Sequence, residues 1–233
     1  MIRKKLLILI LAVAAFALGL VASLRSETTG SGFESKLSGE FLAGFTGDAT
    51  SLDSGMKRAE EALTANSKDA DAMAWHGVGV FFRAGQAFQA GDMETGMDLY
   101  RKGLAEMDKA VQLEPDNTGV RSVRGGFLLQ ATLHMEGNPE TGQLLELGLS
   151  DYEHLYALQK SSLASLPVHG RGELLFGIAD ANRRMGNDAK AKEWFQRVSS
   201  EVKDSSYQKR ADIFLQTGSL TVEQSTCGGC HTP

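Results

Sequence analysis

The sequence contains few of the residues that stiffen or cross-link a chain. It has 4 prolines in 233 residues and only 2 cysteines, both within its last seven residues. Two cysteines separated by two residues close too short a loop to stabilise a domain much, which argues against a disulfide scaffold. The sequence also lacks a run of alternating β-branched residues long enough for a sheet. Apolar residues recur instead at helical spacing, which predicts an all-α fold.

Several kinds of functional sequence are missing as well. There is no nucleotide-binding glycine loop, hydrolase nucleophile elbow or convincing pair of catalytic carboxylates. The formal net charge is −5, and an acidic body argues against nucleic acid as a partner. We therefore expect a binding or electron-transfer protein and not an enzyme that converts a substrate.

The N-terminus carries the only long hydrophobic run. Three cations, Arg3, Lys4 and Lys5, precede nineteen uncharged residues from Leu6 to Leu24. As a helix this run would be roughly 28 Å long, close to the roughly 30 Å of a membrane core. Residues 1–24 are thus predicted to be an uncleaved membrane anchor or a signal peptide cleaved after Ser23. Both alternatives export the protein to a periplasmic or extracellular location, and an uncleaved segment would tether it to the inner membrane.

The rest of the chain is organised around a repeated turn. The segments GDMETGMDLYRKGLAEMDKAV (91–111) and GNPETGQLLELGLSDYEHLYAL (137–158) share several residues at an offset of 46, and a third turn starts at Gly186, 49 residues further on. Each turn lies between an apolar and an amphipathic helix, which predicts helical hairpins stacked as an α-solenoid. We predict a linker and first helical segment at 25–49, repeats at 50–217, and at 218–233 a short tail with little of its own to pack.

The repeats resemble the tetratricopeptide repeat (TPR) family over residues 50 to 217. Gly77 occupies a small position where two helices would cross, and Pro115 falls where that family has a proline. The spacing of 46 to 49 residues exceeds the family's period of about 34, so the helices or turns must be longer here. The resemblance implies a groove that binds segments of partner proteins. In the third repeat the matching positions are Leu175, Ile178, Ala179, the Gly186–Asn187 turn, Ala191, Phe195 and Val198.

The chemistry of the chain is concentrated in CGGCH, residues 227–231. C-x-x-C-H resembles the attachment motif of c-type cytochromes. The resemblance implies one covalent haem c, with thioethers from Cys227 and Cys230 and His231 as the proximal iron ligand. Three alternatives remain: a redox-active dithiol tail, a zinc site completed by ligands from elsewhere, and a plain disulfide or inert tail.

Only two residues follow His231, so the cover of a haem and its second axial ligand must come from elsewhere. The distal ligand is unknown from sequence. His76 and His169 are the first candidates, His76 beside Trp75 and His169 in a predicted loop between repeats. Each also has a structural interpretation, His76 as a buried, hydrogen-bonded helix residue. Ranked after them are His134 and His154, predicted as helix residues near turns or surfaces, and Met185.

These features together predict an exported monohaem c-type cytochrome that exchanges electrons with redox partner proteins. Docking of its haem tail on a neighbouring copy would give a homo-oligomer or a filament. The alternative is a membrane-anchored TPR scaffold or assembly factor, for example in cytochrome maturation, whose CxxC acts as a thiol relay. A structural adaptor that needs neither cysteine is the third prediction.

Overall fold

A computed structural model describes residues 32–135 and 137–225. All regular secondary structure in these two ranges is helical, which confirms the all-α prediction. The predicted anchor or signal peptide at 1–24 and the CGGCH motif lie outside the described residues. None of the helices formed by the described residues is both long and apolar enough to cross a membrane.

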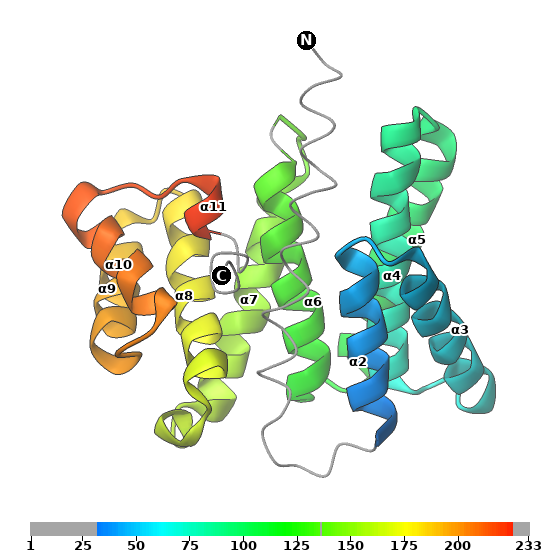
Figure 1. The fold of residues 1–233 in the computed structure, drawn as a ribbon, viewed down its shortest axis with the longest axis horizontal. Coiled ribbons are helices and arrows are strands. Elements are labelled where there is room, and N and C mark those ends of the chain that lie inside the picture. The colour runs from blue at the N-terminus through cyan, green and yellow to red at the C-terminus, as the bar shows by residue number, and fades with distance from the viewer. Residues whose placement is uncertain (1–31, 136, 226–233) are drawn as a thin grey trace. The chain divides into compact units, whose positions relative to one another are not determined.

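The chain divides into two compact units, and the division falls inside one helix, between Arg124 and Gly125. Unit 1 (residues 32–124) has two helical hairpins followed by the first half of α6 (Figure 1). The first hairpin packs against α4 of the second through both of its helices. The helices are α2 (Gly32–Phe45), α3 (Ala49–Ala65), α4 (Ala70–Ala90), α5 (Met93–Leu113) and α6 (Thr118–Ala131).

Aspartates begin three of the helices of unit 1. The side chains of Asp48, Asp69 and Asp92 each accept a hydrogen bond from the backbone N–H three residues further on, at 2.9 to 3.1 Å. Such caps satisfy backbone donors that have no partner within the helix. The hairpin boundaries of unit 1 are therefore set locally by the sequence.

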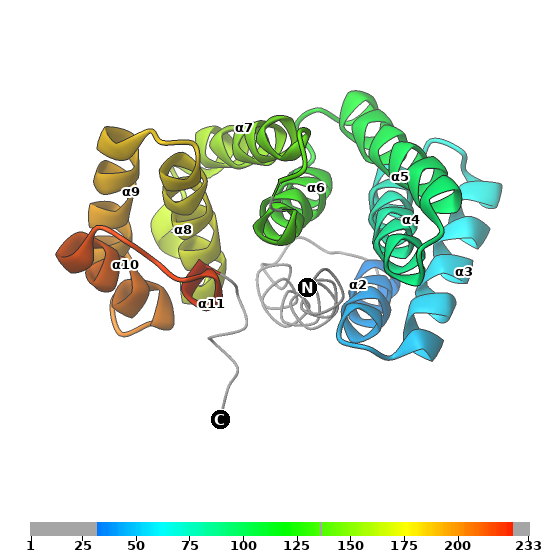
Figure 2. The same cartoon turned by 90° about the horizontal axis from the view of Figure 1, so that it is seen from above.

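Unit 2 (residues 125–225) contains the second half of α6 and the helices that follow it. α7 packs against α8, α8 against α9, and α10 against both α8 and α9, and Figure 2 shows α8 and α9 side by side. The elements after α6 are two short 3₁₀ helices, η1 (Thr132–His134) and η2 (Leu163–Ser165), with α7 (Thr141–Gln159), α8 (Val168–Arg184), α9 (Asp188–Glu201), α10 (Ser206–Thr217) and α11 (Val222–Ser225).

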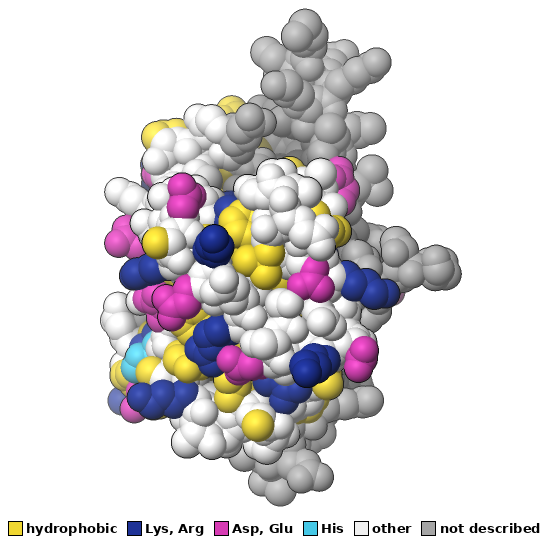
Figure 3. Space-filling view, turned by 90° about the vertical axis from the view of Figure 1, so that its left-hand side faces the viewer, with side chains coloured by type: hydrophobic (Ala, Val, Ile, Leu, Met, Phe, Trp, Pro, Cys, Tyr) yellow, Lys and Arg dark blue, Asp and Glu magenta, His cyan; other side chains and the backbone are white. Residues whose placement is uncertain are grey.

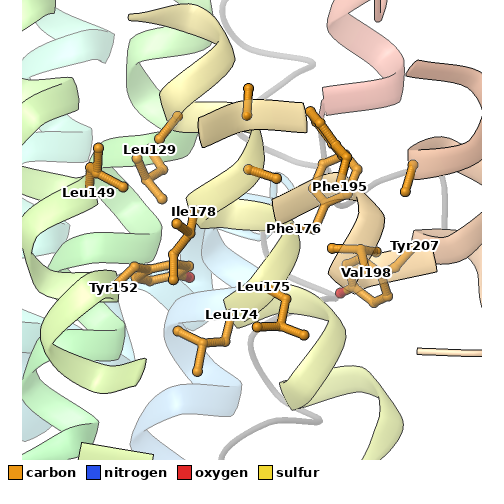
Figure 4. Packing of buried hydrophobic residues seen from close by; sticks show 14 of the residues in the cluster. Leu129, Leu149, Tyr152, Leu174, Leu175, Phe176, Ile178, Phe195, Val198 and Tyr207 are labelled. Carbon is orange, nitrogen blue, oxygen red and sulfur yellow. The ribbon is translucent and has the colours of Figure 1, made fainter. Parts of the chain in front are cut away.

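The core of unit 2 is a single apolar cluster around α8 (Figure 4). Leu175 and Ile178 from α8 are fully buried in it, as is Phe195 from α9, and Tyr152 and Tyr207 join it from α7 and α10. The six apolar side chains singled out in the third repeat, Leu175, Ile178, Ala179, Ala191, Phe195 and Val198, are fully buried. The outer face of α9 and α10 instead carries acidic, basic and apolar side chains interspersed (Figure 3), which is typical of a solvated helix surface.

The repeated turns rest on glycines with left-handed backbone. Gly91, Gly137 and Gly186 have φ angles of 83°, 80° and 75°, a region that other residues rarely adopt. Gly218, with φ 74°, ends α10 as the sequence predicts. The 46- and 49-residue offsets in the sequence thus correspond to the same turn conformation in three places.

Glycines also allow close helix crossings in both units. A Cβ atom on Gly103 would lie 2.6 Å from the carbonyl oxygen of Gly77, and one on Gly77 would lie 2.9 Å from that of Gly103. In unit 2, a Cβ on Gly148 would lie 3.1 Å from the carbonyl oxygen of Gly125. The backbones of α4 and α5, and of α6 and α7, therefore touch directly.

Candidate functional site

Cys227, Cys230 and His231 lie outside the described residues, but the segment that leads to them is described. We call residues 219–225 the C-terminal arm. It ends at Ser225, two residues before the first cysteine. The arm therefore determines where the predicted haem tail leaves the fold.

The arm is organised locally by a reciprocal cap. The backbone N–H of Gln224 donates to Thr221 Oγ1 at 3.3 Å, and the backbone N–H of Thr221 donates to Gln224 Oε1 at 2.9 Å. This is a capping box, a common signature of a helix N-terminus. The sequence TVEQ therefore begins the short helix α11 directly before the motif.

The last described residue of the arm is bound to α8. Ser225 is 3% exposed, and its hydroxyl donates to Asp180 Oδ1 at 3.1 Å. Arg183 Nη2 donates to the same hydroxyl at 3.2 Å, while its Nε donates to Asp180 Oδ1 at 2.8 Å. A buried carboxylate and a cation from the C-terminal half of α8 thus hold the chain at Ser225.

A buried arginine from α10 provides the second attachment. Arg210 is 6% exposed, and its Nη1 donates to the backbone oxygen of Gln224 at 3.1 Å. Its guanidinium lies over the rings of Phe176 and Tyr207, 4.2 and 4.8 Å from their centroids. Cation–π contacts of this kind are strongest where water is excluded, so Arg210 links the arm to the core cluster.

The arm combines exposed and anchored residues. Positions 219 and 221–223 are exposed, whereas Leu220 packs against the core cluster and Ser225 is buried. Chain ends usually fray unless they are tied down. The arm's partners lie 14 to 45 residues earlier in the chain, beyond what local pattern can indicate.

His76, the first distal-ligand candidate, lies buried in α4 between two carboxylates. Its Nδ1 donates to Glu106 Oε2 at 2.5 Å, and its Nε2 lies 3.6 Å from Glu60 Oε1. The structural interpretation of His76 as a buried, hydrogen-bonded helix residue is confirmed. Binding iron through either nitrogen would displace a carboxylate.

His169 lies in the first turn of α8, so its predicted position in a loop is wrong. The helix begins directly after Pro167. His169 Nδ1 is 3.2 Å from the Tyr207 hydroxyl, and Nε2 is 3.8 Å from Glu173 Oε2. His169 thus has a hydroxyl within hydrogen-bonding distance of Nδ1 and a carboxylate near Nε2.

His134, at the end of η1, differs from His76 and His169 in the partners of its ring nitrogens. Its Nε2 is shielded from solvent and has no hydrogen-bond partner, and the same is true of Gln130 Oε1, four residues earlier. Arg184 approaches this segment from α8, where it donates to Leu129 O at 2.7 Å and to Thr132 Oγ1 at 2.6 Å. Burial lowers the pKa of His134 below its usual value, and the nearby charge of Arg184 lowers it further. The neutral imidazole is therefore favoured.

The remaining candidates are less enclosed. His154 is a partly buried residue of α7, and Met185, directly after α8, is 37% exposed. No cluster of three or more His, Cys, Asp or Glu side chains suited to a metal ion occurs among residues 32–135 and 137–225. In the described residues, each histidine or methionine candidate could therefore supply only one ligand to a metal ion.

Sequence reasoning missed Arg210, Asp180 and Gln130. Of the contacts of the arm, only the capping box could have been predicted from the sequence, from the three-residue spacing of Thr221 and Gln224. Comparisons of the chain with protein-family models, with curated proteins and with solved structures found no match.

Proposed function

We propose that this chain is an exported monohaem c-type cytochrome that exchanges single electrons with partner proteins. The observation that carries the proposal is the CGGCH sequence at residues 227–231. Cys227 and Cys230 would form the thioethers and His231 would be the proximal ligand, with the hydrophobic N-terminus directing export. The helical hairpins serve as a TPR-like scaffold that holds the tail and contacts partners.

Two features of unit 2 fit a bound haem. The arm fixes the chain at Ser225, close to the first cysteine. One turn of chain also carries two buried polar atoms with no partner, Gln130 Oε1 and His134 Nε2. Such atoms in a native fold call for an explanation such as an ion or other bound group.

The chain's own residues have two tasks in this function. The thiols of Cys227 and Cys230 would hold the haem through two thioether bonds, and the imidazole of His231 would bind its iron. Arg210, Asp180 and Arg183 hold the root of the tail. When bound, the haem supplies an iron that gains and loses one electron.

The first experiment is production of the full chain in a host that attaches haem to exported proteins. We expect an intact mass larger than the polypeptide by one haem, and a haem absorption band that survives denaturation. A Cys227→Ala, Cys230→Ala double variant is the matched control and should carry none. A mass equal to the bare polypeptide in a maturation-competent host would overturn the proposal.

A second variant separates the cytochrome from the thiol-relay scaffold. His231→Ala removes the proposed iron ligand and leaves both thiols. A cytochrome should lose its normal ligation and reduction potential, whereas a dithiol relay should keep its thiol redox activity. Retained thiol exchange without haem would favour the assembly factor.

A further inference from the structure

The side chains that hold the C-terminal arm form a binding surface in unit 2. We call this surface the arm seat, and it consists of Phe176, Asp180 and Arg183 from α8 with Tyr207 and Arg210 from α10. The three residues of α8 follow helical spacing and therefore share one face of that helix. In both views α11 lies beside α8 (Figures 1 and 2). The seat is thus built by two helices that pack against each other.

The arm seat also has internal contacts of its own. Arg183 Nε donates to Asp180 Oδ1 at 2.8 Å. The guanidinium of Arg210 lies 4.2 and 4.8 Å from the ring centroids of Phe176 and Tyr207. None of these three contacts involves an arm residue, so we expect the seat to keep its shape when the arm leaves. A preorganised site of this kind binds a ligand without first ordering its own side chains.

The arm presents three groups to the rest of unit 2. Leu220 packs on the core cluster, the carbonyl oxygen of Gln224 accepts a hydrogen bond from the seat, and the hydroxyl of Ser225 both donates to the seat and accepts from it. Positions 219 and 221–223 are exposed. Because the anchored groups lie near its two ends, the arm can leave as one segment while α8 and α10 stay packed.

Gly218 is the hinge between α10 and the arm. Its φ angle is 74°, and its N–H donates to Phe214 O at 2.7 Å. Residues 216–219 around it are exposed. The left-handed backbone ends α10 and turns the chain back toward its own unit. An extended hinge would instead carry the end of the arm up to about 25 Å from Gly218.

A second copy of this chain supplies a ligand that fits the seat. The contacts select an apolar side chain, a backbone carbonyl four residues later and a hydroxyl on the next residue. The arm of another copy presents the same groups in the same order. Two copies that exchange arms restore these contacts in both seats, which gives a closed two-fold dimer. A chain's own arm acts at an effective concentration of roughly 1 mM, so exchange requires protein at a comparable concentration.

We propose that the arm seat binds the arm of a second copy, so that two chains associate by reciprocal exchange of residues 219–225. The fit of the seat to these residues and the single-residue hinge at Gly218 carry the proposal. It does not require haem, so it can fail while the proposed function holds, and the reverse. The competing explanation is an arm that only detaches, which leaves a monomer.

The test uses the full chain in the Cys227→Ala, Cys230→Ala background, where neither haem nor a disulfide can join two copies. Gly218→Val disfavours the left-handed hinge, because a β-branched residue rarely adopts that backbone. We expect the dimerisation constant, measured by analytical ultracentrifugation, to rise about tenfold for each exchanged arm. Glu223 should stay protected from a glutamate-specific protease, since each arm occupies the seat of the other copy.

Two variants in the same background are the matched controls. Gly91→Val strains a glycine that ends α4 in the same left-handed conformation, and it should leave dimerisation as in the background. Adding Arg210→Ala to Gly218→Val removes a seat residue, so the dimer should be lost and the chain cleaved after Glu223. A dimer that persists in this combined variant would show association through another surface and overturn the proposal.

A monomeric Gly218→Val chain would also overturn it. Cleavage after Glu223 in that monomer would show an arm that only detaches, and protection of Glu223 would show an arm that keeps its own seat. Each result therefore assigns the arm to one of three states: exchanged, detached or held by its own chain.

A measurement with the unaltered hinge keeps the proposal falsifiable if Gly218→Val folds poorly. Isotope-labelled and unlabelled full chains of the same background are mixed at about 1 mM, the concentration at which exchange competes with the chain's own arm. Native mass spectrometry should then detect dimers of mixed mass, and Arg210→Ala should reduce their fraction. The absence of mixed dimers, or an equal fraction with Arg210→Ala, would contradict arm exchange.

Discussion

His76 in unit 1 and His134 in unit 2 are both helical residues, but their ring nitrogens differ in the protein atoms that face them. His76 lies 6% exposed in α4, with carboxylates at 2.5 and 3.6 Å from its two ring nitrogens. His134 lies at the end of a short 3₁₀ helix with a buried nitrogen that no protein atom satisfies. The two histidines therefore differ in how far the protein itself satisfies their ring nitrogens.

The largest expected effect is in unit 2 and comes from releasing the C-terminal arm. Arg210→Ala removes two cation–π contacts and the hydrogen bond to Gln224 O, and should cost about 3 kcal/mol of unfolding free energy. A glutamate-specific protease should then cleave after Glu223 in the folded protein.

Arg197→Ala is the matched control for arm release. Arg197 also lies over two rings, those of Tyr156 and Trp194, but no hydrogen bond joins it to the arm. Its loss should leave Glu223 protected. Equal cleavage of both variants would show that Arg210 does not hold the arm.

The next effect compares a glycine helix crossing of unit 1 with one of unit 2. Gly103→Ala places a Cβ 2.6 Å from backbone atoms of α4, whereas Gly148→Ala places one 3.1 Å from its nearest atoms on α6. Overpacking should outweigh the gain in helix propensity for Gly103 and destabilise the protein by about 2 kcal/mol. Denaturant unfolding of both variants measures the difference, and a Gly148→Ala cost as large as that of Gly103→Ala would contradict it.

A smaller effect compares the two histidines directly in the Cys227→Ala, Cys230→Ala background, where no haem contributes. His76→Gln loses its short contact with Glu106 and leaves a partly buried carboxylate, which should cost about 1 kcal/mol. His134→Gln removes a nitrogen that has no partner, so its unfolding free energy should stay close to that of the background. A larger loss from His134→Gln than from His76→Gln would reverse the comparison.

The smallest effect is the dependence of stability on pH in that same background. The pKa of His134 is lowered in the fold by burial and by Arg184, so the unfolded chain binds a proton at higher pH than the folded one. Stability should be full above about pH 6.5 and fall as the pH drops through the folded pKa. His134→Gln should flatten this part of the profile, and an unchanged slope would assign the pH dependence to other groups.

Much of the fold could be predicted from the sequence because its signals are local. The turns at Gly91, Gly137 and Gly186 depend on one residue's backbone conformation, and the buried positions of α8 and α9 follow from helical spacing. The partners of the histidines could not be predicted in this way. His76 meets Glu106 across 30 residues of sequence, and only helix crossings decide that pairing.

The same limit applied to the candidate site. The motif at Cys227, Cys230 and His231 is readable because its chemistry lies in five consecutive residues. The ranking that placed His76 and His169 before His134 used sequence neighbours alone, which carry no information about which ring nitrogens are engaged. Only the tertiary structure gives the contacts of those nitrogens.

The sequence by itself therefore determined the helical architecture, its repeated turns and the CGGCH motif, because each depends on residues adjacent along the chain. Tertiary structure decided where the C-terminal arm is held and which histidine keeps a buried nitrogen unpaired. Those properties depend on side chains up to 55 residues apart in the sequence, which come into contact only when the helices of unit 2 pack around α8.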